Sequence, residues 1–349
     1  MTDLLENRKD TRVSLINIFL DSTGIQRFLD DDDVTEIIIN RPNEIITEGS
    51  KGWQFYESKG VNNKDLLDLL VAINNYNDGA SALNAKNPIK SLVMPNGERL
   101  QVIIPPACEL DCISLTIRKP SLKRFTIQDY IKSGRFENVK IAGRATNELS
   151  EIQKKLKALY LNYTTDGAHF EPFLQACVDA RLNILIVGGT GSGKTTFGKT
   201  IADMFPSDRR IITIEDVHEM ELPLHKNHVH LFYKEGGVKA RQLIEAAMRM
   251  KPDHIFLAEL RGDEAWSYIE ALNTGHEGSV TTIHANNTYA SFSRLVNIIK
   301  QSPVGLTLEE SFIAKTVKTT IDVILFFNHT YCTECFYEPE EKNKLLTLL

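Results

Sequence analysis

Hydrophobic and polar positions divide the chain into two stretches with different patterns. In the first 133 residues, short apolar runs that end at turn residues predict strands at 34–39, 100–105 and 114–120. Apolar residues at helical spacing predict a helix over 64–73. The hairpin-like spacing of the strands favours an antiparallel sheet, so we expect residues 1–133 to form an α+β domain.

The second stretch, residues 167–349, alternates between strand and helix patterns. Apolar strand runs are found at 183–187, 210–214, 254–258, 278–283 and 320–327. Helical patterns lie between them, including 194–204, 238–250 and 263–273. This alternation predicts an α/β domain whose mainly parallel sheet is covered on both faces.

Residues 134–166 have the pattern of a linker that carries its own helix. Leu149, Ile152, Leu156 and Leu159 fall on one helical stripe, with three lysines outside it. An apolar row left in water costs about 0.8 kcal/mol per CH₂, so we expect the stripe to be buried. It can pack on the C-terminal domain of its own subunit or on a neighbouring subunit. The second arrangement would swap domains between subunits.

A phosphate-binding loop is predicted at 188–195, which fits G-x-x-x-x-G-K-[ST] between an apolar strand and a helix. Its glycines let backbone N–H groups turn towards phosphate oxygens, and the following helix adds its N-terminal dipole. Lys194 can reach the β- and γ-phosphates, and the Thr195 hydroxyl can ligate Mg²⁺. The candidate nucleotide-binding residues are Gly188, Gly189, Thr190, Gly191, Ser192, Gly193, Lys194, Thr195 and Thr196.

Carboxylates follow two of the predicted strands, and hydrolysis needs such groups to orient water and to handle metal charge. Glu215, Asp216 and Glu219 come after one strand, and Glu259 comes after another. Because the ends of adjacent strands form the ligand crevice of an open α/β sheet, we expect these acids beside the phosphate-binding loop. Glu215 or Glu259 can hold Mg²⁺ through water, and which of the three glutamates is the general base stays open. Capping of a following helix is the alternative role.

Histidines give a weaker signal than the carboxylates. His284 ends a predicted strand and points towards the same crevice, where it can contact a γ-phosphate or serve only in packing. His225, His228 and His230 are close in sequence. Their neighbourhood fits an alternating strand better than a metal site.

Composition and charge narrow the class of protein. The 349 residues are 42% hydrophobic and 25% charged, with a formal net charge of −6, as in an ordinary globular protein. Acidic residues outnumber basic ones both before and after residue 133. This balance argues against bulk electrostatic binding to nucleic acid or anionic lipid.

Cysteine content and apolar run length bear on the compartment. Five cysteines, an odd number, favour reduced thiols and a cytosolic setting. Cys332 and Cys335 form a single C-x-x-C pair, and zinc would need two further ligands. No apolar run reaches the roughly 20 residues that span a bilayer, and the first residues lack a signal-peptide pattern.

Four motifs together resemble those of the secretion traffic ATPases. The phosphate-binding loop is followed by boxes at 214–219, 248–261 and 274–286. Their order and spacing are similar to the Walker A, Asp, Walker B and His boxes of that family. The stretches 94–106 and 114–121 also match. They point to the VirB-type branch, the hexameric ATPase of bacterial type IV secretion.

The resemblance implies roles for individual residues. It makes Glu259 the Walker B carboxylate and His284 a functional residue of the His box. The acids of the Asp box are Glu215, Asp216 and Glu219. Because the N-terminal domain of this family closes over the nucleotide, Arg118, and with a weaker match Arg99, are expected to contact phosphate. A surface salt bridge is the alternative for both arginines.

At the level of the whole protein, the resemblance implies an ATP- and Mg²⁺-dependent motor. It would drive assembly of, or transfer through, a type IV secretion or conjugation system. The expected state is a homohexamer with a RecA-like C-terminal domain, peripheral at the cytoplasmic face of the inner membrane and in contact with other secretion-system ATPases and components.

Two alternatives stay open. One is a motor for type IV pilus assembly or retraction, whose members often carry two C-x-x-C pairs where this chain has one. The other is a nucleotide-gated scaffold with little turnover. A helicase is disfavoured, because no basic patch interleaved with aromatic residues is present.

Overall fold

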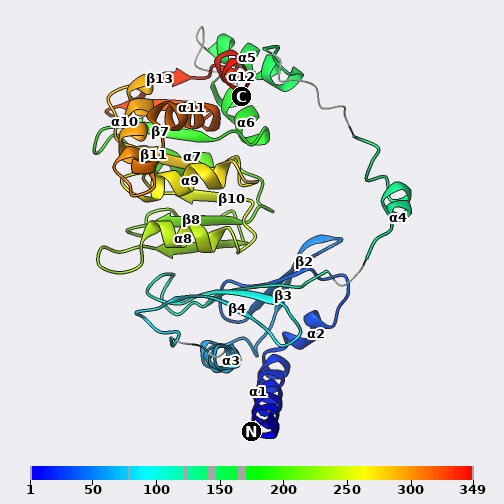
Figure 1. Cartoon of the computed structure of the whole chain (residues 1–349). Coiled ribbons are helices and arrows are strands. Elements are labelled where there is room, and N and C mark those ends of the chain that lie inside the picture. Colours follow the sequence, from blue (N-terminus) through cyan, green and yellow to red (C-terminus); the bar gives the residue numbers. More distant parts are fainter. Residues whose placement is uncertain are drawn as a thin grey trace.

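A six-stranded antiparallel sheet organises the N-terminal part of the chain in this computed structural model (Figure 1), in the order β3-β2-β1-β6-β5-β4. The structure describes residues 2–77, 79, 81–121, 124–139, 147–163 and 170–347. The strands are β1 (Glu36–Ile39), β2 (Glu44–Gly49), β3 (Gly52–Glu57), β4 (Ile89–Val93), β5 (Arg99–Ile103) and β6 (Ser114–Arg118). The helices are α1 (Thr2–Thr23), α2 (Gln26–Leu29) and α3 (Asn63–Tyr76). The predicted α+β organisation is confirmed.

One face of this sheet carries α1 and α3 (Figure 1). Their apolar side chains form a single core with alternate residues of the strands, such as Ile37 and Ile39 of β1. Asn62 caps α3, because its side-chain oxygen accepts a hydrogen bond from the backbone N–H of Asp65 at 2.9 Å. The opposite face of the sheet points towards the C-terminal part of the chain (Figure 1).

A seven-stranded sheet organises the C-terminal part, in the order β13-β12-β7-β11-β10-β8-β9. All strands but the edge strand β13 run parallel to their neighbours. The strands are β7 (Ile184–Gly188), β8 (Ile211–Glu215), β9 (His228–Phe232), β10 (His254–Leu257), β11 (Val280–Ile283), β12 (Val323–Asn328) and β13 (Tyr331–Phe336). The mainly parallel sheet expected from the sequence is confirmed.

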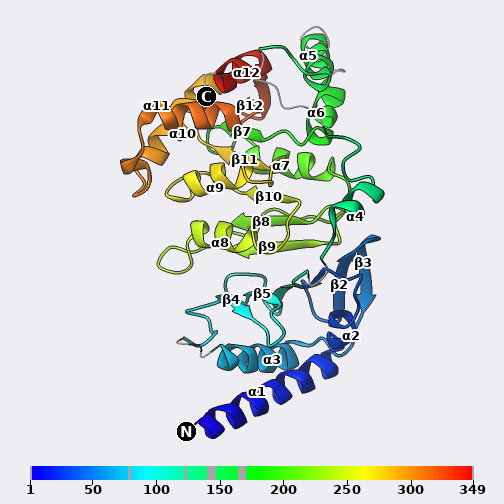
Figure 2. The same ribbon diagram turned by 45° about the vertical axis from the view of Figure 1, so that its right-hand side comes forward.

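Helices cover both faces of the parallel sheet (Figure 2). They are α6 (Phe170–Asp179), α7 (Lys194–Asp203), α8 (Ala240–Ala247), α9 (Glu264–Leu272), α10 (Thr288–Lys300), α11 (Glu310–Thr320) and α12 (Pro339–Thr347). Alternate residues of β7 face the two layers. Leu185 and Val187 join the core of α8–α11, whereas Ile184 and Ile186 join that of α6 and α7. Burial on both faces explains the continuous apolar runs in the sequence.

The edge strand β13 is not among the strands that the sequence predicts. Its residues are largely exposed, so its apolar pattern is weak. Cys332 and Cys335 lie on this strand, opposite Phe327 and Leu325 of β12, and a register shift between them interrupts the alternation of the strand. Cys332 is exposed, while Cys335 packs against the inner core. Among the described residues, neither cysteine belongs to a group of three or more metal-ligating side chains.

Two helices lie in the sequence between the strands of the two sheets, α4 (Ile127–Lys132) and α5 (Glu151–Tyr163). Leu156 of α5 is 2% exposed in a core that includes Phe173 of α6. The Tyr160 hydroxyl donates a hydrogen bond to the Cys335 carbonyl at 2.8 Å. The stripe thus packs on the C-terminal part of its own chain, the first of the two expected arrangements. Ile152 departs from that expectation, because it is 63% exposed.

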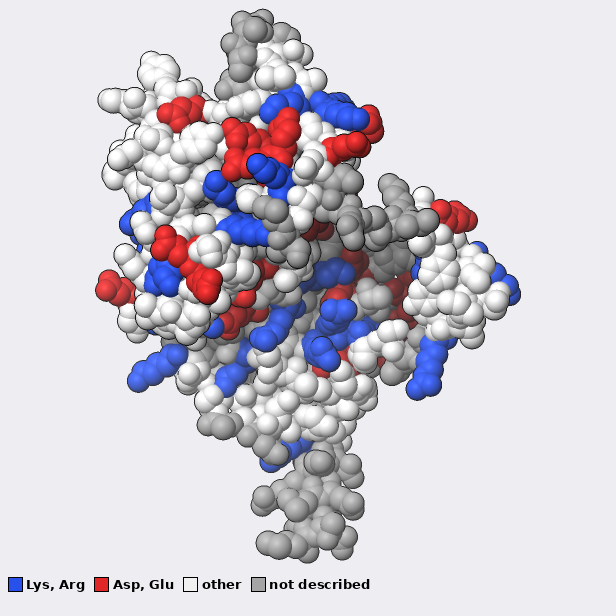
Figure 3. Space-filling view, turned by 45° about the horizontal axis from the view of Figure 1, so that its top comes forward, with Lys and Arg blue, Asp and Glu red and all other residues white. Residues whose placement is uncertain are grey.

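Parts of the predicted linker are outside the described residues, namely 140–146 and 164–166, as is the expected start of the C-terminal domain at 167. The domain limits 1–133, 134–166 and 167–349 stay a prediction. Among the described residues, no helix is long and apolar enough to cross a membrane. Basic and acidic side chains are intermixed on the face shown in Figure 3.

The two sheets meet at the β9 side of the C-terminal sheet (Figure 2). Arg210, which precedes β8, is fully buried there and donates hydrogen bonds to the side-chain oxygens of Asn40 and Asn227. Burial lowers the pKa of its guanidinium to about 9, which still leaves it charged at neutral pH. At the other end of β8, where Phe232 pairs with Glu215, the backbone N–H of Phe232 donates to the Ala107 carbonyl at 2.9 Å.

Helix α5 provides a matched stability test. We expect Leu156→Ala to lower the free energy of unfolding by about 2–5 kcal/mol, because the side chain is buried and leaves a cavity. Ile152→Ala, on the same helix but exposed, should change it by less than about 0.5 kcal/mol. Denaturant unfolding of both variants measures the difference. Equal effects would contradict the packing of α5 described here.

Candidate nucleotide site

The glycine-rich loop 188–193 joins β7 to α7, as the sequence predicts. A Cβ at Gly188 would lie 2.5 Å from the Ser192 hydroxyl and 2.6 Å from the Phe327 carbonyl oxygen, so only glycine fits. Gly191 and Gly193 have φ angles of 72° and 81°, which side chains rarely adopt. The loop therefore keeps the tight turn that lets its N–H groups face an anion.

Lys194 is the first residue of α7 and folds back over the loop. Its Nζ donates to the carbonyl oxygens of Gly188 and Gly189 at 3.0 and 2.8 Å. Burial lowers the pKa of the Lys194 ammonium, and the nearby Glu259 carboxylate opposes that shift. The charge of Lys194 is thus held at the loop, with a carboxylate within electrostatic reach.

A solvent-open cavity of about 590 Å³ adjoins the loop. It is lined by Gly189, Thr190, Gly191, Ser192, Ala285, Asn286, Phe326, Phe327, Asn328, His329 and Thr330. Thr195 is half-buried and Thr196 is exposed, both on the first turn of α7. A ligand on the loop would have room beside the ends of β11 and β12.

Side chains that follow β8, β10 and β11 form one chain of ion pairs near Lys194. The carboxylate of Glu259 lies 3.2 Å from His284 Nε2 and 2.7 Å from an Arg261 nitrogen. Arg261 also pairs with Asp216 at 2.8 Å. The hydrogen bond from Arg261 to Glu259 raises the pKa of that guanidinium further. The structure thus brings together Glu259, Asp216 and His284, as expected.

Arg261 is missing from the residues that the sequence analysis assigns to the site. Its position two residues after Glu259 is the signal that could have identified it. In the fold it bridges the carboxylates of Glu259 and Asp216, which follow neighbouring strands. A cation in this place can stabilise negative charge that develops near Glu259.

Glu215 has a different environment from Glu259. Its side chain is 1% exposed, and its Oε2 accepts hydrogen bonds from the backbone N–H groups of Glu219 and Met220, both at 2.8 Å. Burial alone would raise the pKa of Glu215, but hydrogen bonds from His230, Thr213 and these amides outweigh burial and lower it. Glu215 therefore holds the loop that carries Asp216, whereas Glu259 lies within electrostatic reach of Lys194.

Arg99 and Arg118 are not brought to the phosphate-binding loop of their own chain. Both lie on the N-terminal sheet, and Arg118 contacts Glu36 at 3.6 Å while its side chain is 71% exposed. Glu36 interacts electrostatically with Lys251 and Arg210. Because these two residues precede β10 and β8, Glu36 and Arg118 lie at the amino ends of those strands. The loop instead follows the opposite, carboxyl ends of the strands. A five-residue strand separates those ends by roughly 17 Å.

In the parallel sheet, the glycine-rich loop follows β7, and the carboxylates follow β10 and β8, with β11 between β7 and β10. This arrangement is that of the RecA-like class of P-loop nucleotide-binding folds. The family described as "Type II/IV secretion system protein" matches residues 146–345. VirB11 of Brucella suis is 35% identical over 96% of this chain and 93% of its own length. VirB11 of Bartonella henselae is 36% identical over 99% of both.

A solved structure agrees with the sequence comparison. The crystal structure of the VirB11 ATPase from the Brucella suis type IV secretion system, in complex with sulphate, superposes with a TM-score of 0.89. It is 35% identical and covers 97% of this chain and 99% of its own. The chain belongs to the VirB11 family of type IV secretion system proteins, and the VirB-type resemblance is confirmed.

Replacement of Glu259 by glutamine separates binding from chemistry. The amide keeps the size of the side chain but cannot accept a proton, so we expect ATP to bind while turnover falls by about 10²–10⁴-fold. Binding by calorimetry and single-turnover hydrolysis measure the two effects. If affinity falls and turnover at saturation is kept, Glu259 has a metal or structural role, and Glu215 or Glu219 is the better base.

Proposed function

We propose that this chain hydrolyses ATP and couples hydrolysis to a type IV secretion or conjugation system. The observation that carries the proposal is the approach of Glu259, with its His284 and Arg261 contacts, to Lys194 at the phosphate-binding loop. Full-length similarity to VirB11, including a solved relative described as an ATPase, supports the same function.

Different residues of the site bind phosphate, activate water and stabilise charge. The loop N–H groups and Lys194 bind the β- and γ-phosphates, which requires the Lys194 Nζ to leave the carbonyls of Gly188 and Gly189. Glu259 orients the attacking water and accepts its proton. His284 and Arg261 fix the Glu259 carboxylate and stabilise charge on the transferred phosphoryl group. Asp216 keeps Arg261 in position through their 2.8 Å ion pair.

The oxygen donors at the site fit Mg²⁺. Thr195 offers a hydroxyl next to Lys194, and Glu259 or Glu215 can act through water, with Glu259 the more accessible of the two. Hard oxygen ligands with several retained waters are what this cation prefers. When bound, Mg²⁺ would neutralise charge on the phosphate oxygens.

A homohexamer at the cytoplasmic face of the inner membrane, in contact with other secretion-system ATPases and components, completes the proposal. Helix α4 supports assembly because none of its residues is buried and Ile127 and Ile131 are 62% and 53% exposed. In this assembly, we assign Arg118 and Arg99 to the nucleotide of a neighbouring subunit, because neither reaches the phosphate-binding loop of its own chain.

Lysine replacements on α7 test the nucleotide site. Lys194→Ala should abolish detectable hydrolysis in a folded protein, because the charge on the β/γ-phosphates is lost. Lys199→Ala, on the same helix, should keep the wild-type rate. Steady-state phosphate release and circular dichroism of both variants provide the measurement. Near-wild-type turnover of folded Lys194→Ala protein would contradict the proposal.

The dependence of specific ATPase activity on protein concentration separates a ring motor from a nucleotide-gated scaffold. We expect activity to rise as subunits assemble, and we expect Ile127→Ser with Ile131→Ser to shift that rise to higher concentration. The matched control is Leu306→Ser, which replaces another exposed apolar residue. A flat, low activity at all concentrations would favour the scaffold. Genetic neighbours would separate the secretion motor from a pilus motor.

A further inference from the structure

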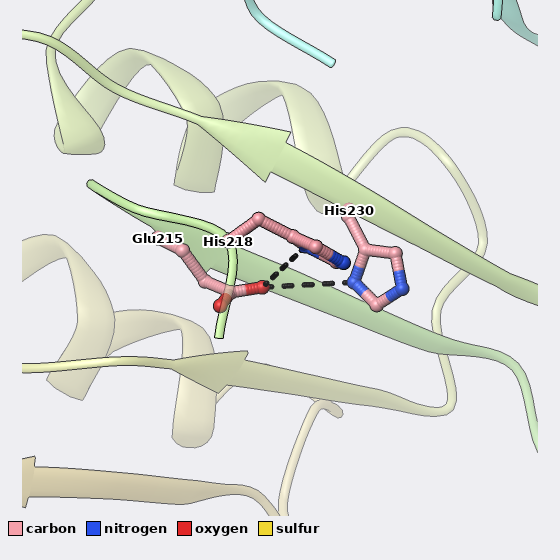
Figure 4. Close-up of side chains that lie close together, drawn as sticks. All are labelled: Glu215, His218 and His230. Atoms are coloured by element: carbon pink, nitrogen blue, oxygen red, sulfur yellow. Dashed lines mark ion pairs between the residues drawn. The ribbon is translucent and has the colours of Figure 1, made fainter. Parts of the chain in front are cut away.

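Three side chains converge beside the nucleotide site without taking part in its chain of ion pairs (Figure 4). Glu215 ends β8, His218 lies in the following loop and His230 lies on β9. One carboxylate oxygen, Oε1 of Glu215, is 3.8 Å from Nδ1 of His218 and 3.6 Å from Nδ1 of His230. The three candidate donor atoms all lie within 4.8 Å of one another.

These separations are close to those of a metal centre. Bonds of about 2.0–2.2 Å in a tetrahedral arrangement place neighbouring donor atoms about 3.3–3.6 Å apart. The two distances from Glu215 are within a few tenths of an ångström of this spacing. The donor atoms of the two imidazoles, which lie within 4.8 Å of each other, would approach by up to about 1 Å to close the cluster around one ion. We propose that Glu215, His218 and His230 bind a divalent transition-metal ion of the zinc class.

The fold fixes two of the three donors in advance. Oε2 of Glu215 is held by two backbone N–H groups, which leaves Oε1 directed at the imidazoles. His230 is buried on β9, and the Thr213 hydroxyl lies 2.6 Å from Oε1 and 2.8 Å from Nδ1 of His230. Such a polar neighbour orients the donors and can share the fourth position with water.

His218 is the solvent-exposed donor of the three, so an ion would enter the site on its side. Its side chain is 41% exposed, and its ring packs against His230 with centroids 4.5 Å apart. A metal would draw the loop that carries His218 onto β9. Because Asp216 of the same loop pairs with Arg261, the ion would also stiffen one support of the nucleotide site.

The donor set distinguishes this site from that of Mg²⁺ bound with a nucleotide. Mg²⁺ prefers oxygen ligands and retained waters, whereas two imidazoles with one carboxylate suit Zn²⁺ and related ions. His230 lies on β9, as its alternating sequence pattern predicts. A strand and a metal site are compatible here, because His218 approaches His230 only in the folded chain.

The test uses untagged full-length protein, freed of metal and without nucleotide. Titration with Co²⁺ should give visible absorption bands typical of low-coordinate Co²⁺, saturating at one equivalent, and Zn²⁺ should bleach them. Zn²⁺ should also raise the thermal midpoint. We expect His218→Ala to lower the affinity for Co²⁺ by at least about tenfold, because even supporting residues of metal sites contribute 10–100-fold in affinity. The rise in thermal midpoint with Zn²⁺ should shrink in the same variant.

His329→Asn is the matched control, because it removes another exposed histidine. It should bind Co²⁺ like the wild type. His218 is exposed, so the His218→Ala protein should fold normally. If the His230→Gln protein also folds, it tests the buried donor in the same way. Absence of a saturable one-equivalent band, or equally tight binding by His218→Ala, would overturn the proposal and leave the cluster as a hydrogen-bond network around Thr213.

Discussion

The buried guanidinium of Arg210 is the constraint on which the relation between the two sheets depends. Burial of a charge is costly unless the charge is hydrogen-bonded, and the Nε and one terminal nitrogen of Arg210 take their acceptors from both parts of the chain. The other terminal nitrogen is buried without a hydrogen-bond partner. Asn40 belongs to the N-terminal part, while Asn227 and the Met250 carbonyl belong to the C-terminal part. The two sheets are thereby held at one mutual position.

Strand β8 connects the buried Arg210 to the side chains of the nucleotide site. Arg210 immediately precedes β8 and Glu215 ends it, so the strand has the interdomain contact at its amino end and the Asp-box loop at its carboxyl end. From there the contacts run through Asp216 and Arg261 to Glu259 and His284. One contiguous set of strand and ion-pair contacts therefore spans the distance between the N-terminal part and the nucleotide site.

Local patterns were sufficient for the elements that carry the site. The strands before the phosphate-binding loop and before Glu259 are buried on both faces, so their apolar runs are continuous in sequence. Strands β3, β4 and β13 were missed because they lie at sheet edges and are mostly exposed or half-buried. The interior strand β2 was also missed, because only three of its six residues are buried. The sequence could therefore predict the fold class and the P-loop, but not the full sheets.

The spacing of residues in the sequence could not predict which side chains from distant segments come together in the fold. Arg118 matches a family stretch, yet its position at the amino ends of the parallel strands follows from how the two sheets meet. The environment of Glu215 likewise depends on His218 and His230, which converge only when β8 and β9 pair. The same holds for Leu156, whose burial partners lie on α6.

The position of a bound nucleotide is the most direct test of the account. A structure of the Glu259→Gln protein with ATP and Mg²⁺ should show the β- and γ-phosphates in the loop 188–195, with Lys194 Nζ moved from the Gly188 and Gly189 carbonyls to the phosphates. His284 should lie on the γ-phosphate side. A nucleotide bound elsewhere, or Lys194 still bonded to those carbonyls beneath the phosphates, would contradict the assignment of this loop as the catalytic nucleotide site.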